Sequence, residues 1–243
     1  MTPGPLLENI DVLILCGGLG KRLRSEVGET QKVMASVNDR PFLDLLLQYL
    51  ANQGFCRVVL LTGYQGEIVE QYYQRNPWNL TIKFSQEKEP LGTGGAIKNA
   101  KAFVRSSPFF ALNGDCFCAM NYNRFLEFHL KKKALATLSV SKIRNKKDFG
   151  SIVLNAKNEI QGFLEKTSQN VSPVVNTGIY CFEKEIFQWM PKKKRFSIET
   201  EFFPTLVGKR FFGFSSRAPF LDIGTPERYK IANKILKTKG RKT

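Results

Sequence analysis

Hydrophobic residues in the first half of the chain form short apolar runs that alternate with amphipathic stretches. The short runs predict buried strands, and the stretch from Pro41 to Gln53 repeats its apolar residues at helical spacing. Pro41 suits the first turn of that helix, and Gly54 suits the position beyond its end. The predicted strands are 11–15, 57–62, 80–84 and 109–112, and the predicted helices are 41–53, 65–75 and 94–104.

Strands that alternate with helices of this length indicate parallel βαβ units and an α/β fold with a doubly wound, mostly parallel sheet of the Rossmann type. In such sheets ligands bind beyond the carboxyl ends of the strands. A glycine-rich segment follows the strand at 11–15, and Asp115 follows the strand at 109–112. The sequence therefore predicts one site that contains both.

From about Leu135 the strand-like runs follow one another more closely. This change predicts that the sheet is extended by a smaller lobe that faces the substrate, with no linker or internal repeat. The predicted strands are 136–141, 151–154, 174–182, 211–214 and 219–222, and the predicted helices are 183–190, 199–207 and 226–237.

The composition is that of a globular protein, with 243 residues, 42% of them hydrophobic and 24% charged. No apolar run approaches the roughly 18 residues of a membrane span, and the first ten residues do not resemble a secretory signal. Five scattered cysteines give neither a disulfide framework nor a zinc pattern, which favours the cytoplasm. We interpret Cys116 and Cys118 as buried apolar residues and His129, the single histidine, as structural.

A formal net charge of +16 fits either a nucleic-acid surface or small polyanionic substrates. The excess is concentrated in short runs, which are typical of solvated faces, and these runs lack interleaved aromatic residues or a known nucleic-acid module. Nucleic-acid binding is therefore a remote alternative, and no nucleic-acid or membrane partner is expected. The runs are 131–133, 146–147, 192–195 and 234–242.

The loop that follows the first strand reads Cys-Gly-Gly-Leu-Gly-Lys-Arg-Leu-Arg over residues 16–24. The dinucleotide pattern fails because Leu23 stands where its third glycine belongs, and the Walker pattern fails because Arg22 follows Gly20-Lys21. What remains is a flexible loop whose amides can approach phosphates, with cations directly after it. Such a loop suits a triphosphate that loses pyrophosphate; the alternative is a plain turn with surface cations.

Six motifs in this order resemble the sugar-phosphate nucleotidyltransferase family, from about Val12 to Leu236. Two departures are Gln31, where the family usually has proline, and Lys21, which replaces a common threonine; we expect Gln31 to loosen the loop that presents Lys32. Within the family, the amino-acid sequences of the loop and of residues 87–97 are most similar to those of D-glycero-D-manno-heptose 1-phosphate guanylyltransferases. In chain order, the motifs are 15–23, which the pair Gln31-Lys32 follows, 90–96, 112–115, 165–166, 176–180 and 221–226.

The resemblance implies one nucleotidyltransferase domain over residues 1–243, with a nucleotide-binding half at about 11–115, a sugar-binding half at about 116–236 and a basic tail at 237–243. The implied substrates are a nucleoside triphosphate, GTP by preference, and a sugar 1-phosphate, and the implied cofactor is Mg²⁺, held by Asp115 and Asp222. The implied catalytic residues are Arg22, Lys32 and Asp115. The implied nucleotide-binding residues are Leu15, Gly17, Gly18, Gly20, Lys21, Glu87, Gly92 and Thr93. The implied sugar-phosphate-binding residues are Gly150, Glu165, Lys166 and Asn176.

The proposed nucleophile, a sugar phosphate, is already an anion near neutral pH because its second pKa is about 6. No general base is needed, so catalysis reduces to positioning and charge neutralisation. A carboxylate at position 87 could accept both N1–H and N2–H of guanine, whereas uracil offers one N–H, and this favours GTP. Gln86 is a rival reader of the base.

Three alternatives remain at this point. A mannose 1-phosphate guanylyltransferase or an amino-sugar uridylyltransferase would keep the chemistry and change the substrates. A catalytically silent sugar-nucleotide sensor should have lost Asp115, Asp222 or Arg22, and all three are present.

Overall fold

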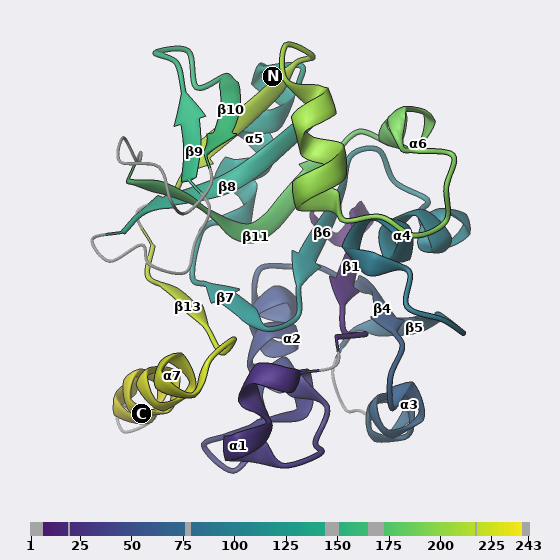
Figure 1. The fold of residues 1–243 in the computed structure, drawn as a ribbon, viewed down its shortest axis with the longest axis vertical. Coiled ribbons are helices and arrows are strands. Elements are labelled where there is room, and N and C mark those ends of the chain that lie inside the picture. Colours follow the sequence, from purple (N-terminus) through teal and green to yellow (C-terminus); the bar gives the residue numbers. More distant parts are fainter. Residues whose placement is uncertain are drawn as a thin grey trace.

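The structure is a computed structural model that describes residues 7–18, 20–75, 79–143, 151–164, 173–216 and 218–239. Within these residues nine strands form one twisted sheet, to which both predicted halves of the chain contribute (Figure 1). Two strands, β10 and β11, run against the other seven, so the sheet is mostly parallel, as predicted. The sheet strands are β1 (Asp11–Leu15), β4 (Arg57–Thr62), β5 (Thr81–Gln86), β6 (Phe109–Asn113), β8 (Ala136–Lys142), β9 (Ser151–Leu154), β10 (Ile160–Leu164), β11 (Val174–Phe182) and β12 (Phe211–Ser215).

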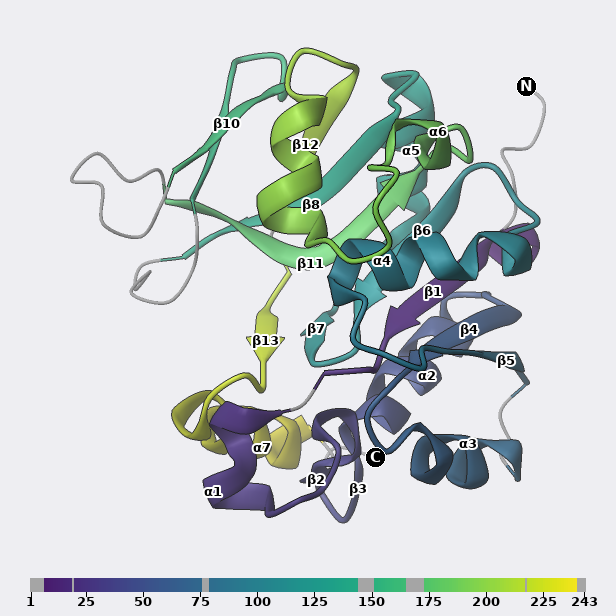
Figure 2. The same ribbon diagram turned by 45° about the vertical axis from the view of Figure 1, so that its right-hand side comes forward.

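Helices cover both faces of this sheet because successive strand residues point to opposite sides. Leu13 of β1 packs in one apolar cluster with α4, α6 and the segment 198–206, whereas Val12 and Ile14 pack in a second cluster with α2, α3 and α5 (Figure 2). The helices are α1 (Arg24–Val27), α2 (Phe42–Asn52), α3 (Gly66–Gln74), α4 (Gly92–Asn99), α5 (Tyr122–Lys131), α6 (Ile186–Trp189) and α7 (Pro226–Lys239).

Two small ladders lie outside the main sheet, and one of them joins the last part of the chain to the segment after β6. Strand β7 (Cys116–Cys118) pairs antiparallel with β13 (Phe220–Asp222), and β2 (Ser36–Val37) pairs with β3 (Arg40–Pro41). A third apolar cluster joins Leu23 and Ala35 from the first part of the chain to Ile223 and Ala232 from the last. Helices α1 and α7 accordingly lie near one another in both views (Figures 1 and 2).

Most predicted elements are confirmed, and the differences concern boundaries, helix type and short elements; the helix predicted at 183–190 is the shorter α6. The helix predicted at 199–207 is a π-helical turn, Ile198–Phe202, followed by a 3-10 helix, Phe203–Leu206. The helix predicted at 94–104 is α4, which begins at Gly92 and passes into a 3-10 turn at Ala100–Phe103. The short elements α1, β2, β3, β7 and β10 were not predicted, since segments of two to five residues carry little periodic signal. Residues 237–239 of the predicted tail belong to α7.

His129 and Cys118 are buried, in agreement with the structural roles predicted for them. His129 is fully buried, and its Nδ1 lies 2.8 Å from the Thr137 hydroxyl. All five cysteines are free thiols. No helix among the described residues is both long and apolar enough to cross a membrane.

Candidate active site

The order of strands reverses at β1, which has β4 on one side and β6 on the other. Ligands in doubly wound sheets bind at such a switch point. Leu15 at the end of β1 pairs with Asn113 at the end of β6, and the Gly114 amide donates to the Leu15 carbonyl at 3.0 Å. A Cβ atom on Gly114 would lie 2.7 Å from that carbonyl oxygen, so only glycine allows the two loops to approach this closely.

A cavity of about 340 Å³ opens beyond these two strand ends. It brings together eight of the residues that the sequence predicted: Leu15, Gly17, Gly18, Lys32, Glu87, Gly92, Thr93 and Asp115. The other lining residues are Cys16, Gln31, Val33, Pro90, Ala96 and Asn113.

Glu87 lies against the glycine loop at one end of this cavity. Strand β5 runs two residues further than predicted and so delivers Glu87 to the sheet edge. Added Cβ atoms on Gly17 and Gly63 would lie 2.9 and 2.7 Å from Glu87 Oε1, so both glycines make room for this carboxylate. Burial raises the pKa of the Glu87 carboxyl, although the Leu91 amide donates to its Oε2 at 3.1 Å.

Gln86, the rival reader of the base, points elsewhere. Its side-chain amide donates to Glu67 of α3 at 3.1 Å, and it is not among the residues that line the cavity. This follows from the alternation of side chains along and just beyond an extended strand.

Lys32 lies in the cavity wall at the start of a 3-10 turn, Lys32–Met34. Gln31 precedes it with φ −58°, and its buried side-chain oxygen accepts the Val33 N–H at 3.0 Å. The expectation that Gln31 loosens this loop is therefore wrong: proline would fix the same φ, and Gln31 instead caps the turn. Gly20 adopts the left-handed conformation against Lys32, and a Cβ atom added to it would lie 3.3 Å from Lys32 Cβ.

Arg22, unlike Lys32, lies outside the cavity wall. It is exposed on a 3-10 turn, Lys21–Leu23, and does not line the cavity. Nothing is described of the Lys21 side chain.

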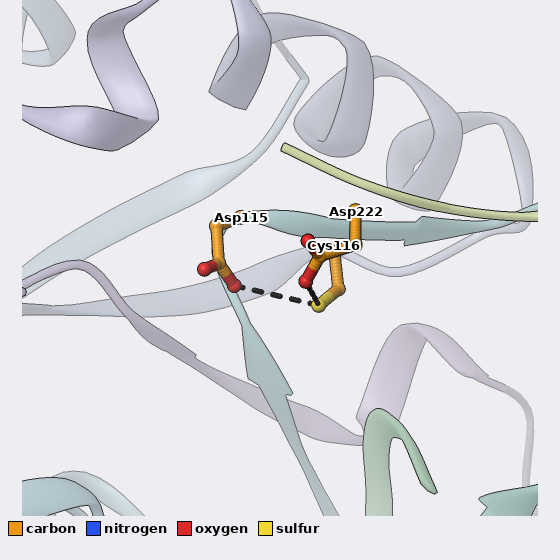
Figure 3. Close-up of side chains that lie close together, drawn as sticks. All are labelled: Asp115, Cys116 and Asp222. Carbon is orange, nitrogen blue, oxygen red and sulfur yellow. Dashed lines mark hydrogen bonds between the residues drawn. The ribbon is translucent and has the colours of Figure 1, made fainter. Parts of the chain in front are cut away.

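Asp115, in the turn between β6 and β7, and Asp222, at the end of β13, lie close together, as predicted. Cys116 follows Asp115 and pairs directly with Asp222 in the β7–β13 ladder, which places their side chains side by side. The Cys116 thiol lies 3.4 Å from Asp115 Oδ1 and 3.5 Å from Asp222 Oδ2 (Figure 3). Burial and the two carboxylates raise the pKa of this thiol well above its ordinary value, so it stays a hydrogen-bond donor.

Each carboxylate also has a cationic partner. Lys32 donates to Asp115 in a close ion pair, and Arg228 Nη1 donates to Asp222 Oδ1 at 2.9 Å. Burial by itself would raise the pKa of the Asp115 carboxyl, but the Lys32 ammonium and the Cys116 hydrogen bond hold it below its usual value. Asp115 is thus an anion at neutral pH.

This donor set fits a divalent metal. One oxygen from each aspartate and the Cys116 sulfur lie within 4.8 Å of one another. Two carboxylates are the usual protein contribution to a magnesium site that is completed by phosphate oxygens. Zinc would favour additional sulfur or imidazole ligands.

The predicted sugar side is only partly described. Gly150, Glu165 and Lys166 lie outside the described residues. Asn176 is described on β11; its amide nitrogen donates to the Tyr180 hydroxyl at 3.0 Å, and its Oδ1 accepts the Gly178 N–H at 2.9 Å.

Three residues of this region were missed by the sequence analysis. Cys116 was interpreted as an apolar core residue, but its sulfur joins the two aspartates. Arg228 and Glu199 were not singled out; Glu199 accepts the Thr93 hydroxyl at 2.6 Å. Only the sequence Thr-Pro-Glu-Arg shortly after Asp222 could have drawn attention to Arg228. No local pattern marks Cys116 or Glu199.

Known proteins resemble this chain in sequence and in fold. The nucleotidyl transferase family model matches residues 11–239. This chain belongs to the nucleotidyl transferase family. It is 37% identical over 228 residues to the D-glycero-alpha-D-manno-heptose 1-phosphate guanylyltransferase of Aneurinibacillus thermoaerophilus, covering 93% of this chain and 98% of that one.

Two further comparisons place it within the nucleotidyl transferases. A solved structure of HddC from Yersinia pseudotuberculosis complexed with GMP-PN superposes with a TM-score of 0.82 at 35% identity, covering 93% of this chain and 99% of that chain. The mannose-1-phosphate guanylyltransferase of Mycobacterium tuberculosis is 30% identical over 226 residues, covering 91% of this chain and 63% of that one.

Proposed function

We propose that this nucleotidyl transferase transfers GMP from GTP to D-glycero-D-manno-heptose 1-phosphate, giving GDP-heptose and pyrophosphate for surface polysaccharide precursors. The observation that carries the proposal is the convergence of Glu87, Lys32 and Asp115 on one cavity at the switch point of the sheet. Near full-length similarity to two heptose 1-phosphate guanylyltransferases supports the choice of substrates.

Glu87 binds the guanine base in this proposal. Its carboxylate faces the cavity with one hydrogen bond from Leu91, which leaves acceptor positions for the N1–H and N2–H groups of guanine. Burial makes these hydrogen bonds stronger than they would be in water.

Lys32 and Arg22 neutralise the triphosphate. Lys32 exchanges its Asp115 carboxylate for phosphate oxygens, a short movement for a flexible ammonium. Arg22, exposed beside the loop, reaches the departing pyrophosphate, and the glycine loop offers its amides to the phosphates.

Asp115 and Asp222 would hold Mg²⁺, with the Cys116 sulfur lying between the two carboxylates and its single S–H available to one of them at a time. When bound, the ion neutralises charge on the reacting phosphates and orients them for in-line displacement. On the sugar side, Lys166 binds the sugar phosphate, while Glu165 and Asn176 bind sugar hydroxyls and Gly150 admits the sugar. Free thiols on all five cysteines support the cytoplasm as the compartment.

The test is a panel of four nucleoside triphosphates against several sugar 1-phosphates, with pyrophosphate release as the readout and Mg²⁺ present or removed by chelation. We expect release from GTP with the heptose phosphate, its loss without metal, and a decrease of at least about 100-fold in Asp115→Asn, because one metal ligand is lost. No pyrophosphate from any pair, or undiminished release by Asp115→Asn, would refute the assignment. Greater activity with mannose 1-phosphate would move the substrate to the mannose class.

A further inference from the structure

A chain of hydrogen bonds runs from Thr93, which lines the cavity, through Glu199 to Tyr180 and Asn176 of β11. One carboxylate oxygen, Oε2, accepts from the Thr93 hydroxyl at 2.6 Å, and the other, Oε1, accepts from the Tyr180 hydroxyl at 3.4 Å. Thr93 lines the cavity on α4, and Tyr180 belongs to β11. The carboxylate therefore joins two elements that the chain places far apart.

The direction of the hydrogen bond at Thr93 is fixed. Its Oγ1 accepts the Ile198 N–H at 2.9 Å, so its own hydrogen is available to Glu199. Ser197 adds a second hydroxyl to the same carboxylate oxygen at 3.0 Å. Since its hydroxyl has these protein partners, Thr93 serves the cavity mainly by holding Glu199.

Close packing holds this junction rigidly. The Gly94 and Gly95 amides both donate to the Phe196 carbonyl, at 3.0 and 3.3 Å. A Cβ atom on Gly94 would lie 2.2 Å from the Phe196 ring. The glycines of α4 therefore allow residues 196–199 to pack closely against this helix. Figure 2 shows α4 and the segment 198–206 in contact.

The direction is equally fixed at Asn176. Its oxygen accepts the Gly178 N–H, which leaves its NH₂ group facing the Tyr180 hydroxyl. Tyr180 is fully buried, and burial together with the Glu199 carboxylate raises its pKa well above the ordinary value, so it remains a donor to Glu199. One N–H of the Asn176 amide donates to the Tyr180 hydroxyl, and this hydrogen bond fixes the direction of the second N–H.

We infer that Glu199 is a positioning residue which sets Asn176, on the sugar side, against Thr93, on the nucleotide side, and thereby places the sugar 1-phosphate for attack. The inference rests on the proposed function. Its chemical basis is that a carboxylate only accepts hydrogen bonds and can take hydroxyls from both sides at once, whereas a carboxamide must offer a donor to one of them. In-line transfer is sensitive to such small displacements.

The first test is Glu199→Gln, which keeps the size of the side chain, with Glu201→Gln as the matched control in the same π-helical turn. Glu201 is exposed and pairs with Lys193. For Glu199→Gln we expect an increase of about 10-fold in KM for the sugar phosphate and a decrease of about 10-fold in kcat, with the Kd for GTP within about 3-fold of wild type. Glu201→Gln should match wild type in all three.

The inference is overturned if Glu199→Gln leaves sugar KM and kcat unchanged, or if GTP affinity falls by the same factor as kcat/KM, since the latter means a general collapse of the cavity. Tyr180→Phe provides a second variant. In the Glu199→Gln background it should add less than about 2-fold, because both changes break one connection; effects that multiply would contradict the connection.

Melting temperatures separate this inference from the proposed function. If the wild-type protein releases no pyrophosphate from any pair, the proposed function fails. The connection is then decided without substrate, by Thr93→Val and Tyr180→Phe. Their decreases in Tm should be non-additive when Glu199 is present and additive in Glu199→Gln. Additivity in both backgrounds overturns the inference alone.

Discussion

Replacing Glu87 by glutamine is the sharpest test of how the cavity selects a base, because the change keeps size and shape and removes one acceptor. In the proposed complex the carboxylate accepts N1–H and N2–H of guanine. In Glu87→Gln the amide oxygen accepts one of these hydrogen bonds as a neutral acceptor. The amide NH₂ group, itself a donor, faces the other N–H of guanine and cannot accept from it.

The magnitude follows from these two bonds. A hydrogen bond to a charged group contributes about 1.5–3 kcal/mol, and a neutral one about 1 kcal/mol. Losing one charged bond and weakening the other costs about 3 kcal/mol, which is roughly a 100-fold increase in the Kd for GTP. Uracil offers a single N–H, which the amide oxygen can still accept as a neutral bond, so the Kd for UTP should rise only by the cost of that weakening, about 1 kcal/mol or roughly 5-fold.

Stability should respond in the opposite sense. Burial raises the folded-state pKa of Glu87, so the native state binds more protons than the unfolded state between the two pKa values. Stability therefore falls as pH rises through that interval, and the penalty is fully present above the raised pKa. Removing the charge in Glu87→Gln should leave Tm equal to or slightly above that of wild type, even as GTP binding weakens.

The assay is isothermal titration calorimetry with GTP and UTP, paired with thermal unfolding, for wild type, Glu87→Gln and the control Gln86→Ala. The control side chain is exposed and bonded to Glu67, so its GTP affinity should match wild type. As the pH is lowered through the raised pKa of Glu87, wild type should lose GTP affinity and Glu87→Gln should not. A Kd for GTP within 3-fold of wild type in Glu87→Gln, or an equal loss for UTP, would refute the role of Glu87.

Two other predictions concern residues that support the cavity. In Gly63→Ala the new Cβ atom would lie 2.7 Å from Glu87 Oε1, so we expect about 10-fold weaker GTP binding by calorimetry with little change in Tm; unchanged affinity would contradict the packing argument. Gln31→Ala should lose about 1 kcal/mol of unfolding free energy in urea because the cap of the Lys32 turn is removed. Gln31→Pro should lose less, since φ −58° already suits proline, and a proline variant less stable than the alanine variant would count against this.

The strands and helices of the first half were predictable because their signals are local. The apolar run 11–15 and the helix predicted at 41–53 are confirmed almost to the residue as β1 and α2. The π-helical turn at Ile198–Phe202 was not predictable in the same way, because its geometry depends on Thr93 and the glycines of α4, which pack against it.

The same distinction, between local signals and contacts of distant residues, applies to the candidate site. The sequence by itself determined the glycine loop, the strand-end aspartates and the order of the motifs, since these depend on short spacings and turn chemistry. The tertiary structure decided that Cys116 joins Asp115 to Asp222, that Glu87 rather than Gln86 faces the cavity, and that Glu199 accepts hydrogen bonds from both Thr93 and Tyr180. Thr93 and Glu199 are 106 positions apart, and so are Cys116 and Asp222. Strand register and sheet order bring such residues together, and no local pattern in the sequence encodes those contacts.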